Sequence, residues 1–345
     1  MPKKINVAIV GATGMVGSAV LSILEERKFP MNKLYLLASK RSAGESREFN
    51  GKMLTVMDLE TFDFSQTNLS FFCASNEIAA EFAPKAANMG NIVIDKSSFF
   101  RYHSDVPLIV PEVNGHMLAK VKKNSIISSP NCNTIPIVIA LKPIYDAVGI
   151  SRINVATYQS VSGTGKDAVS ELVEQTAALL NGKTIKPKVY PQQIAFNILP
   201  HIDDFQENGY TKEEMKIVWE THKIFEDQTI AINPTAVRVP VLFGHSAALH
   251  IETKSKITVD QAAALLSKAP GIKLMKGKNA YPTPAHDAAG QDPVFVGRLR
   301  EDISTEKGLN LWVVADNIRI GAALNAIHIA ERLFKKNAQK RKEKS

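Results

Sequence analysis

The feature that most constrains the fold is a glycine-rich turn directly after a short apolar strand. Residues 5–10 read Ile-Asn-Val-Ala-Ile-Val, which is typical of a buried strand, and Gly11-x-x-Gly14-x-x-Gly17 follows. The spacing of apolar residues then predicts a helix over 18–27. Glycines in such a turn permit a tight reversal, close approach of the backbone to a pyrophosphate and close packing of helix on strand. The pattern therefore predicts a dinucleotide-binding unit.

Further strands and helices alternate along the first third of the chain. Apolar spacing predicts a helix at 78–89, and short apolar runs predict strands at 34–38, 69–74, 91–95 and 125–128. Such alternation is typical of a doubly wound parallel sheet of the Rossmann type. We expect residues 1–131 to form this domain.

The pattern changes after Cys132. Longer and more alternating strands are predicted at 153–158 and 247–252, with a helix at 166–180 and a proline-rich stretch at 187–200 between them. We therefore expect an α+β second domain, residues 132–317, with a mostly antiparallel sheet. A last helix within 318–334 is expected to pack back onto the first sheet.

Composition limits the classes of protein that remain. Two cysteines, Cys73 and Cys132, do not make a disulfide framework, and no apolar run has the length of a membrane span. These features favour a cytoplasmic protein. The net charge is +8, but residues 335–345 carry six Lys or Arg and one Glu, so +5 lies in a tail that we expect to be a solvated end. We expect no nucleic-acid partner, no membrane contact and no metal centre.

Cys132 stands where a loop leads into a predicted helix that begins with the apolar run 135–141. The N-terminus of a helix lowers the pKa of a thiol because it offers unpaired N–H groups and the positive end of the helix dipole. Cys132 is therefore a candidate nucleophile. The alternative interpretation is a small buried side chain, which is the interpretation that we keep for Cys73.

The end of the second predicted strand bears on the choice of cofactor. An enzyme that uses NAD places an acidic residue there, on the ribose 2′-hydroxyl, whereas this chain has Ser39-Lys40-Arg41-Ser42. Basic and hydroxyl groups at this position suit a 2′-phosphate. The sequence thus favours NADP, although a solvated basic turn is the alternative.

Seven motifs occur in a fixed order and together carry a resemblance. They are Gly-Ala-Thr-Gly-Met-Val-Gly at 11–17, Ser-Ser-Phe-Phe-Arg at 97–101, Val-Pro-Glu-Val-Asn at 110–114, Ser-Pro-Asn-Cys-Asn-Thr at 129–134, Tyr-Gln-Ser-Val-Ser-Gly-Thr-Gly at 158–165, Arg-Val-Pro-Val at 238–241 and Gly-His-Ser at 244–246. Across essentially the whole chain the set resembles the aspartate-β-semialdehyde dehydrogenase family. The resemblance implies reversible, NADPH-dependent reduction of β-aspartyl phosphate to aspartate semialdehyde, a step toward lysine and diaminopimelate, threonine and methionine. It also implies a homodimer.

The resemblance implies roles for particular residues. Cys132 carries the acyl group as a thioester, His245 is the general acid and base, and Gln159 orients the substrate. Arg238 pairs with the α-carboxylate of the substrate, and Glu213 binds its α-ammonium group. From sequence alone, Glu213 and Lys216 are equally explained as one charged face of a helix over 212–225.

Phosphate and cofactor sites follow in the same way. The resemblance implies that Arg101, Asn131 and Lys216 bind phosphate. The implied cofactor-binding residues are Gly11, Thr13, Gly14, Met15, Val16, Gly17, Arg41, Ser42, Ser162, Gly163 and Asn317. One stretch departs from the family, because Ala74-Ser75-Asn76-Glu77 stands where the family has a small Ser-Ala-Gly-Gly-like turn near the cofactor. Glu77 is unfavourable beside a pyrophosphate unless it points away or caps the next helix.

Three other interpretations remain open at this point. An N-acetyl-glutamyl-phosphate reductase uses the same cysteine and histidine, but it typically has Gly-Cys-Tyr and needs no residue for a free ammonium group. A glyceraldehyde-phosphate dehydrogenase carries Cys-Thr-Thr-Asn after its nucleophile, which this chain lacks. A dinucleotide sensor without activity leaves the combination of Cys132, Gln159, Arg238 and His245 unexplained.

Overall fold

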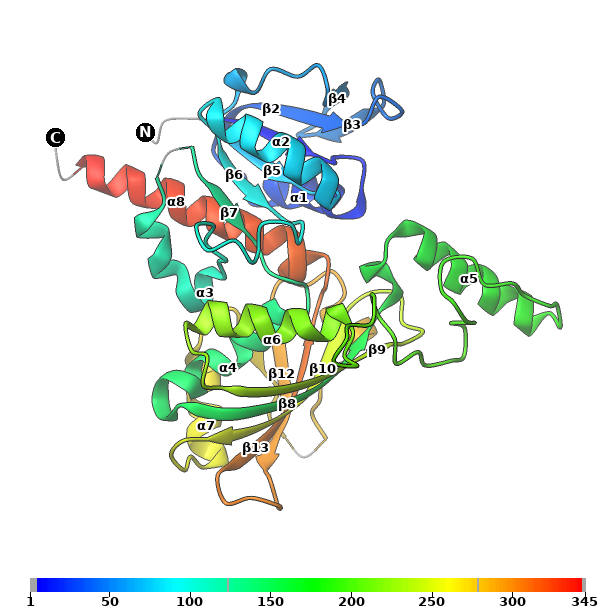
Figure 1. Cartoon of the computed structure of the whole chain (residues 1–345), viewed down its shortest axis with the longest axis vertical. Coiled ribbons are helices and arrows are strands. Elements are labelled where there is room, and N and C mark those ends of the chain that lie inside the picture. The colour runs from blue at the N-terminus through cyan, green and yellow to red at the C-terminus, as the bar shows by residue number, and fades with distance from the viewer. Residues whose placement is uncertain (1–4, 123, 278, 343–345) are drawn as a thin grey trace. The chain divides into compact units, whose positions relative to one another are not determined.

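The computed structural model describes residues 5–122, 124–277 and 279–342 (Figure 1). In the last helix, side chains are described as far as residue 334. By internal contacts the chain divides into two compact units. One is Met1–Asn131 with Ala322–Ser345, and the other is Cys132–Gly321. No helix in the described part of the chain is long and apolar enough to cross a membrane.

The first unit contains a sheet of seven described strands in the order β3-β4-β2-β1-β5-β6-β7. All neighbouring pairs are parallel except β3 with β4. The strands are β1 (Ile5–Val10), β2 (Met31–Ala38), β3 (Ser46–Phe49), β4 (Lys52–Asp58), β5 (Leu69–Phe72), β6 (Ile92–Asp95) and β7 (Ile126–Ser128). This arrangement confirms the predicted Rossmann-type sheet, and it adds β3 and β4, which the sequence did not predict.

The glycine turn between β1 and α1 (Met15–Glu26) leaves no space for side chains at two positions. Gly11 has φ +78°, and a Cβ there would lie 2.4 Å from the carbonyl oxygen of Cys73. A Cβ on Gly17 would lie 2.1 Å from the carbonyl oxygen of Gly11. At both positions a side chain would collide with backbone atoms, so only glycine fits. The motif needs its glycines for such close backbone packing.

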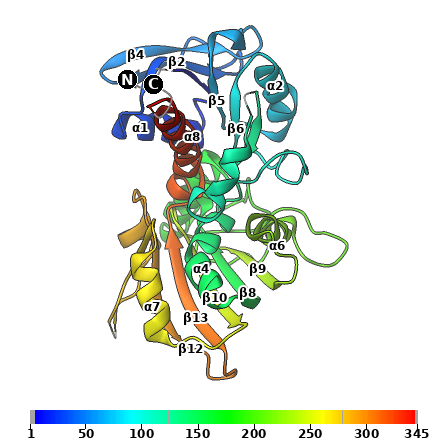
Figure 2. The same ribbon diagram turned by 90° about the vertical axis from the view of Figure 1, so that its left-hand side faces the viewer.

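Helices of the first unit come from both ends of the chain. They are α1, α2 (Asn76–Asn88), the short α3 (Pro111–Asn114) and α8 (Leu324–Lys342), with one-turn or two-turn 3₁₀ segments at Phe64–Gln66 and Gly115–Lys120. Figure 2 shows α8 beside α1, and Arg27 donates two hydrogen bonds of 2.8 and 3.0 Å to the Glu331 carboxylate between them. The basic tail predicted at 335–345 is partly helical, because the backbone of α8 continues to Lys342. Residues 343–345 lie outside the described residues.

The second unit contains a sheet of six described strands in the order β11-β12-β13-β10-β8-β9. Three of its five neighbouring pairs are antiparallel, whereas β8 with β9 and β11 with β12 are parallel. The strands are β8 (Ile150–Gln159), β9 (Ala231–Arg238), β10 (His245–Thr253), β11 (Ile272–Leu274), β12 (Val294–Glu301) and β13 (Gly308–Ala315). The predicted mostly antiparallel sheet is confirmed, although β9, β11, β12 and β13 were not predicted.

Three helices of this unit pack on the sheet. The central one is α4 (Thr134–Val148), which contacts β10, β12 and β13 and is flanked by α6 (Lys212–Phe225) and α7 (Val259–Lys268) (Figure 1). A buried capping box, in which Thr211 and Glu214 exchange hydrogen bonds, fixes the start of α6. The start of α6 carries Glu213 and Lys216, so the cap also fixes where these two charges lie.

The helix α5 (Lys166–Leu180) packs against the proline-rich segment that follows it. The buried carboxylate of Glu171 accepts hydrogen bonds from the backbone N–H groups of Lys188 and Val189, and Gln175 accepts from those of Ile194 and Ala195. These side chains satisfy a backbone that belongs to no strand.

We expect Gly17→Ala to destabilise the protein although alanine is the better helix former. Alanine gains up to about 1 kcal/mol of helix propensity, but its Cβ would lie 2.1 Å from the Gly11 carbonyl oxygen. The net cost should be about 1–3 kcal/mol, as for other overpacked sites. Gly14→Ala is the matched control, because its Cβ would lie 3.3 Å from the same oxygen. Equal midpoints of urea unfolding for the two variants would contradict the close-approach argument.

Candidate active site

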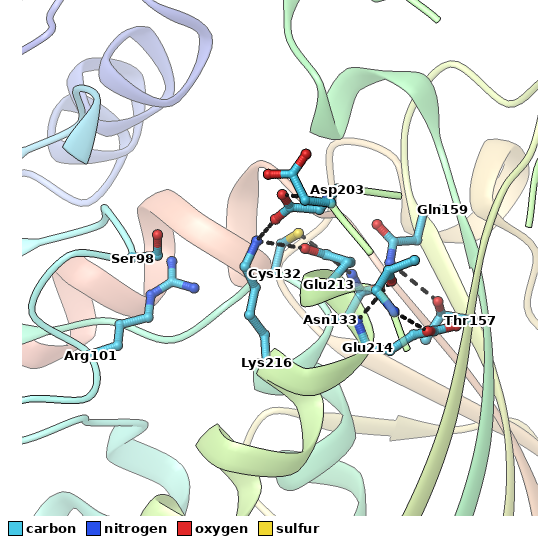
Figure 3. Close-up of polar contacts among 12 residues, drawn as sticks. Ser98, Arg101, Cys132, Asn133, Thr157, Gln159, Asp203, Glu213, Glu214 and Lys216 are labelled. Atoms are coloured by element: carbon cyan, nitrogen blue, oxygen red, sulfur yellow. Dashed lines mark hydrogen bonds and ion pairs between the residues drawn. The ribbon is translucent and has the colours of Figure 1, made fainter. Parts of the chain in front are cut away.

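Cys132 lies at the beginning of the second unit, immediately before Asn133, the N-cap residue of α4. Its side chain is partly exposed. A Cβ on Gly321 would lie 3.2 Å from the Cys132 Cβ, so a larger residue there would press on the cysteine. The Nδ2 atom of Asn133 lies 3.8 Å from the Cys132 Sγ and donates a hydrogen bond of 3.1 Å to Glu213 Oε1 (Figure 3). The asparagine thus connects the cysteine with α6.

Three predicted site residues meet at one end of the second sheet. Gln159 ends β8 and is paired in register with Arg238, the last residue of the parallel strand β9. The antiparallel strand β10 begins at His245, one residue before the pair formed by Ser246 and Tyr158. All three side chains are buried. Strand register therefore brings Gln159 together with two residues that are distant from it in the sequence.

The His245 ring is held in one tautomer by the backbone. The N–H of Ser160 donates a hydrogen bond of 3.0 Å to His245 Nδ1. An amide N–H only donates, so Nδ1 presents its lone pair and the neutral ring carries its hydrogen on Nε2. In the described part of the chain His245 Nε2 has no hydrogen-bond partner although it is buried. Burial, and then the positive charge of Arg238, lowers the pKa of His245 to about 3, so the neutral ring is the resting form.

Asn317, in the turn that follows β13, supports this arrangement. Its Oδ1 accepts hydrogen bonds from the Gly244 N–H at 2.9 Å and from the hydroxyl groups of Ser160 and Ser162 at 3.2 Å each. Asn317 and Ser162 were expected to bind cofactor, and the structure places both beside His245. The sequence analysis missed Ser160, which contacts the His245 ring through its backbone N–H and its hydroxyl group, each 3.0 Å from Nδ1.

Arg238 is oriented by the same turn. One guanidinium nitrogen donates a hydrogen bond of 2.7 Å to the Ser160 carbonyl oxygen, whereas the buried Nε has no hydrogen-bond partner among the described residues. A Cβ on Gly163 would lie 3.1 Å from Arg238 Nη1 and 3.2 Å from His245 Nε2. Glycine at 163 therefore keeps a space open in front of both groups. A buried cation with donor capacity left suits a carboxylate ligand.

Glu213 and Lys216 form an ion pair that includes a third residue. The Lys216 ammonium lies 2.9 Å from Glu213 Oε2 and 2.7 Å from Asp203 Oδ2 (Figure 3). Glu213 is almost completely buried, which excludes the interpretation of this pair as a solvated helix face. Sequence reasoning did not find Asp203, which lies in the turn before α6.

Arg101 and Asn131, the other expected phosphate ligands, belong to the first unit, and both are buried. Arg101 donates a hydrogen bond of 2.8 Å to the Lys96 carbonyl oxygen. The Lys96 ammonium in turn lies 3.0 Å from Ser129 Oγ and 3.1 Å from the Pro130 carbonyl oxygen. Lys96, which the sequence analysis did not single out, thus holds the segment that leads to the cysteine.

The expected cofactor residues of the first unit lie at the carboxyl ends of β1 and β2. The N–H of Gly11 donates a hydrogen bond of 2.9 Å to the Leu37 carbonyl oxygen, which joins the glycine turn to the turn that carries Arg41 and Ser42. Arg41 is exposed there. A tight glycine turn, in which no side chain fits at Gly11 or Gly17, and a nearby arginine are features that a dinucleotide with a 2′-phosphate needs.

The stretch Ala-Ser-Asn-Glu at 74–77, which differs from the expected family pattern, has a structural explanation. Glu77 lies in the first turn of α2, and a hydrogen bond from the Ser75 hydroxyl lowers the pKa of its carboxyl group. A carboxylate at this end of a helix is favourable because of the helix dipole. The Asn76 side chain accepts hydrogen bonds of 3.0 and 3.1 Å from the N–H and the hydroxyl of Ser98. Glu77 is thus part of the start of a helix.

Two family models match the chain. One, described as the NAD binding domain of semialdehyde dehydrogenase, covers residues 6–121, and the other, described as its dimerisation domain, covers residues 141–320. Together with the fold, they define an oxidoreductase that acts on an aldehyde group and uses a nicotinamide dinucleotide.

Relatives and solved structures narrow this class. A protein named aspartate-semialdehyde dehydrogenase from Legionella pneumophila is 59% identical to this chain, over 96% of this chain and 96% of its own length. Another of the same name, from Shewanella sp. (strain DB6705), is 56% identical over 97% of this chain and 99% of its own length. A crystal structure of aspartate semialdehyde dehydrogenase II from Vibrio cholerae, complexed with ASA, superposes with a TM-score of 0.95 at 54% identity, covering 96% of this chain and 99% of its own. The chain belongs to the aspartate-semialdehyde dehydrogenase family.

Burial of His245 predicts a particular dependence of stability on pH. In the unfolded chain the imidazole takes a proton below about pH 6.5, whereas the folded pKa is about 3. The unfolded state thus binds more protons between these values, so the stability from neutral His245 is complete above pH 6.5 and is lost as the pH falls toward 3. His245→Gln should reduce the loss of unfolding free energy between pH 7 and pH 5 by about 2 kcal/mol.

The exposed His250 lies on the same strand and supplies the control variant His250→Gln. Its unfolding free energy, measured by urea titration at both pH values, should follow the wild-type dependence. Identical pH dependence for all three proteins would contradict a neutral buried His245.

Proposed function

We propose that this protein is an NADPH-dependent aspartate-semialdehyde dehydrogenase. It reduces L-4-aspartyl phosphate reversibly to L-aspartate 4-semialdehyde and phosphate, in the biosynthesis of lysine and diaminopimelate, threonine and methionine. The observation that carries the proposal is the convergence of Gln159, Arg238 and His245, all buried, at one sheet end in a chain of this family. The name of the Vibrio cholerae complex, which holds ASA, supports the same substrate.

The chemistry centres on the Cys132 sulfur. In the oxidative direction the thiolate adds to the aldehyde carbon, so that a C–S bond forms and the carbonyl π electrons move to oxygen. When bound, NADP would supply the hydride acceptor. Loss of the hydride from that carbon would leave Cys132 as a thioester. A phosphate oxygen then attacks the thioester carbon, the C–S bond breaks and the thiolate is regenerated. The reductive direction is the reverse of these steps.

The geometry of His245 supports a role in handling the carbonyl oxygen. Because Ser160 occupies Nδ1, the resting ring offers an N–H at Nε2, which is a donor for an oxygen that gains negative charge. The N–H at Nε2 would provide the general-acid part of the acid and base role expected of His245. Gln159 is buried at the end of the neighbouring strand, where its side chain contributes to positioning.

Substrate and phosphate have separate partners in this proposal. The Arg238 guanidinium binds the α-carboxylate through donor capacity that the protein leaves open at Nε. Glu213 binds the α-ammonium group, and Lys216, Arg101 and Asn131 bind phosphate. The N-terminal unit binds NADP, residues 132–317 carry catalysis and dimerisation, and the protein is a homodimer. The description of the matched second domain supports dimerisation.

We expect Cys132→Ala to abolish phosphate-dependent formation of NADPH from L-aspartate semialdehyde. The loss should be at least about a thousandfold, because the covalent route is removed. NADP binding, measured by titration calorimetry, should remain. Cys73→Ala is the matched control, since burial raises the pKa of the Cys73 thiol to about 12 and makes it inert. Wild-type activity that does not depend on phosphate would refute the proposed reaction.

Preference for NADP should depend on the exposed turn after β2. Arg41→Gln should raise the Kd for NADP about tenfold, the effect of one lost charge-assisted contact with a phosphate, and leave the Kd for NAD unchanged. Arg47→Gln, at a surface arginine in β3, should change neither. Equal affinity of the wild-type protein for NADP and NAD would remove this assignment.

A further inference from the structure

The ion-pair cluster of Asp203, Glu213 and Lys216 contains more negative than positive charge. One ammonium group lies between two carboxylates, at 2.7 and 2.9 Å. The side chains of Lys216 and Glu213 are only 12% and 7% exposed, and that of Asp203 is 28% exposed. Charges in such a setting are screened less than on an open surface. The charge of Lys212 also acts on Asp203. The feature on which the argument rests is therefore that two carboxylates share the Lys216 ammonium group.

The charges in this cluster are maintained at neutral pH. Burial alone would lower the pKa of Lys216, but the charges of Glu213 and Asp203 outweigh it, and the pKa is raised. Burial alone would likewise raise the pKa of Asp203, but its contact with Lys216 holds the pKa below the ordinary value. An ammonium ion therefore stands between the two carboxylates.

The turn that carries Asp203 is fixed at both ends. Leu199 and Arg238 exchange backbone hydrogen bonds of 3.0 and 2.8 Å, and Phe205 forms a bridge with Thr211, the N-cap of α6. Asp203 itself has φ +69°, a conformation that aspartate and asparagine tolerate better than most residues. Its Oδ1 accepts a hydrogen bond of 2.9 Å from the next backbone N–H. The carboxylate is thus positioned against Lys216 by the fold.

Two carboxylates around one lysine permit an exchange of partners. Glu213 Oε1 is held by Asn133, while Oε2 faces the lysine. An incoming ammonium group can bind Oε2 without leaving Lys216 unpaired, because Asp203 keeps its charge balanced. With a single carboxylate, the incoming cation would have to displace the lysine from its only partner, which is costly at a half-buried site.

We propose that Asp203 is a specificity-determining residue for the α-ammonium group of the substrate, and that it acts by holding Lys216 so that Glu213 can bind that group. The inference rests on the proposed function and deepens it. It predicts that Asp203 affects substrates that carry the ammonium group and leaves the analogue that lacks it unaffected.

The test compares two aldehydes. L-aspartate semialdehyde has the ammonium group, and succinate semialdehyde lacks it. Asp203→Asn keeps the shape, the acceptor for the N–H of Asp204 and a tolerated positive φ, and it removes the charge. This variant should lower kcat/KM for L-aspartate semialdehyde about tenfold, the effect of one unit charge beside a largely buried ion pair, mainly through KM. For succinate semialdehyde kcat/KM should stay within about twofold.

Two further variants complete the design. Asp204→Asn removes the same charge one residue away, where the carboxylate forms no hydrogen bond or ion pair within the described residues; it should leave both substrates unchanged. Asp203→Glu restores the charge and should recover part of the discrimination between the two aldehydes.

Other outcomes overturn the inference. Equal losses for both aldehydes in Asp203→Asn would make Asp203 a merely structural residue. A lower KM for phosphate with unchanged aldehyde kinetics would make it a competitor of phosphate for Lys216. If the wild-type enzyme shows no phosphate-dependent oxidation of L-aspartate semialdehyde, the proposed function fails and takes this inference with it. Wild-type activity with unchanged discrimination in Asp203→Asn rejects the inference alone.

Discussion

The register of β8 with its two neighbours is the constraint on which the site in the second unit depends. It places Gln159 beside Arg238 and brings the first residue of β10 to the same sheet end. Burying a guanidinium and an imidazole there is costly unless their polar atoms are satisfied. The turn after β8 meets that need in part, because the N–H of Ser160 bonds to His245 Nδ1 and its carbonyl oxygen bonds to Arg238. The backbone of one residue thus contacts both the imidazole and the guanidinium, and the Ser160 hydroxyl also lies 3.0 Å from His245 Nδ1.

The sequence predicted elements whose signals are local. The strand, glycine turn and helix at the N-terminus follow from adjacent residues, and the structure confirms them. The strands β3 and β4 were not predicted because they are mostly exposed and neither has a long apolar run; Thr55 interrupts the apolar residues of β4. Pro234 interrupts the pattern of β9, yet β9 is an edge strand, where a missing N–H costs little.

The site was predictable to the extent that side-chain type carries the function. Cysteine, histidine, arginine and glutamate in ordered motifs identified the family, which the comparisons show. The supporting contacts were not predictable. Ser160 contacts His245 partly through its backbone N–H, which residue type does not reveal. The position of Asp203 depends on a backbone with positive φ, which residue type does not reveal either. The resemblance identified Asn317 as a site residue, but its hydrogen bond with the Gly244 N–H is seen only in the structure.

The last helix has a consequence for how the protein is made. Asn325 donates hydrogen bonds to Ser129 Oγ and to the Ile109 carbonyl oxygen, and His328 pairs with Glu112 at 2.7 Å. These partners leave the ribosome some two hundred residues before α8 does. Domains generally fold as they emerge, but here the first unit to be synthesised waits for the last segment. Translation that stops after the second unit would release a chain whose N-terminal unit still lacks α8.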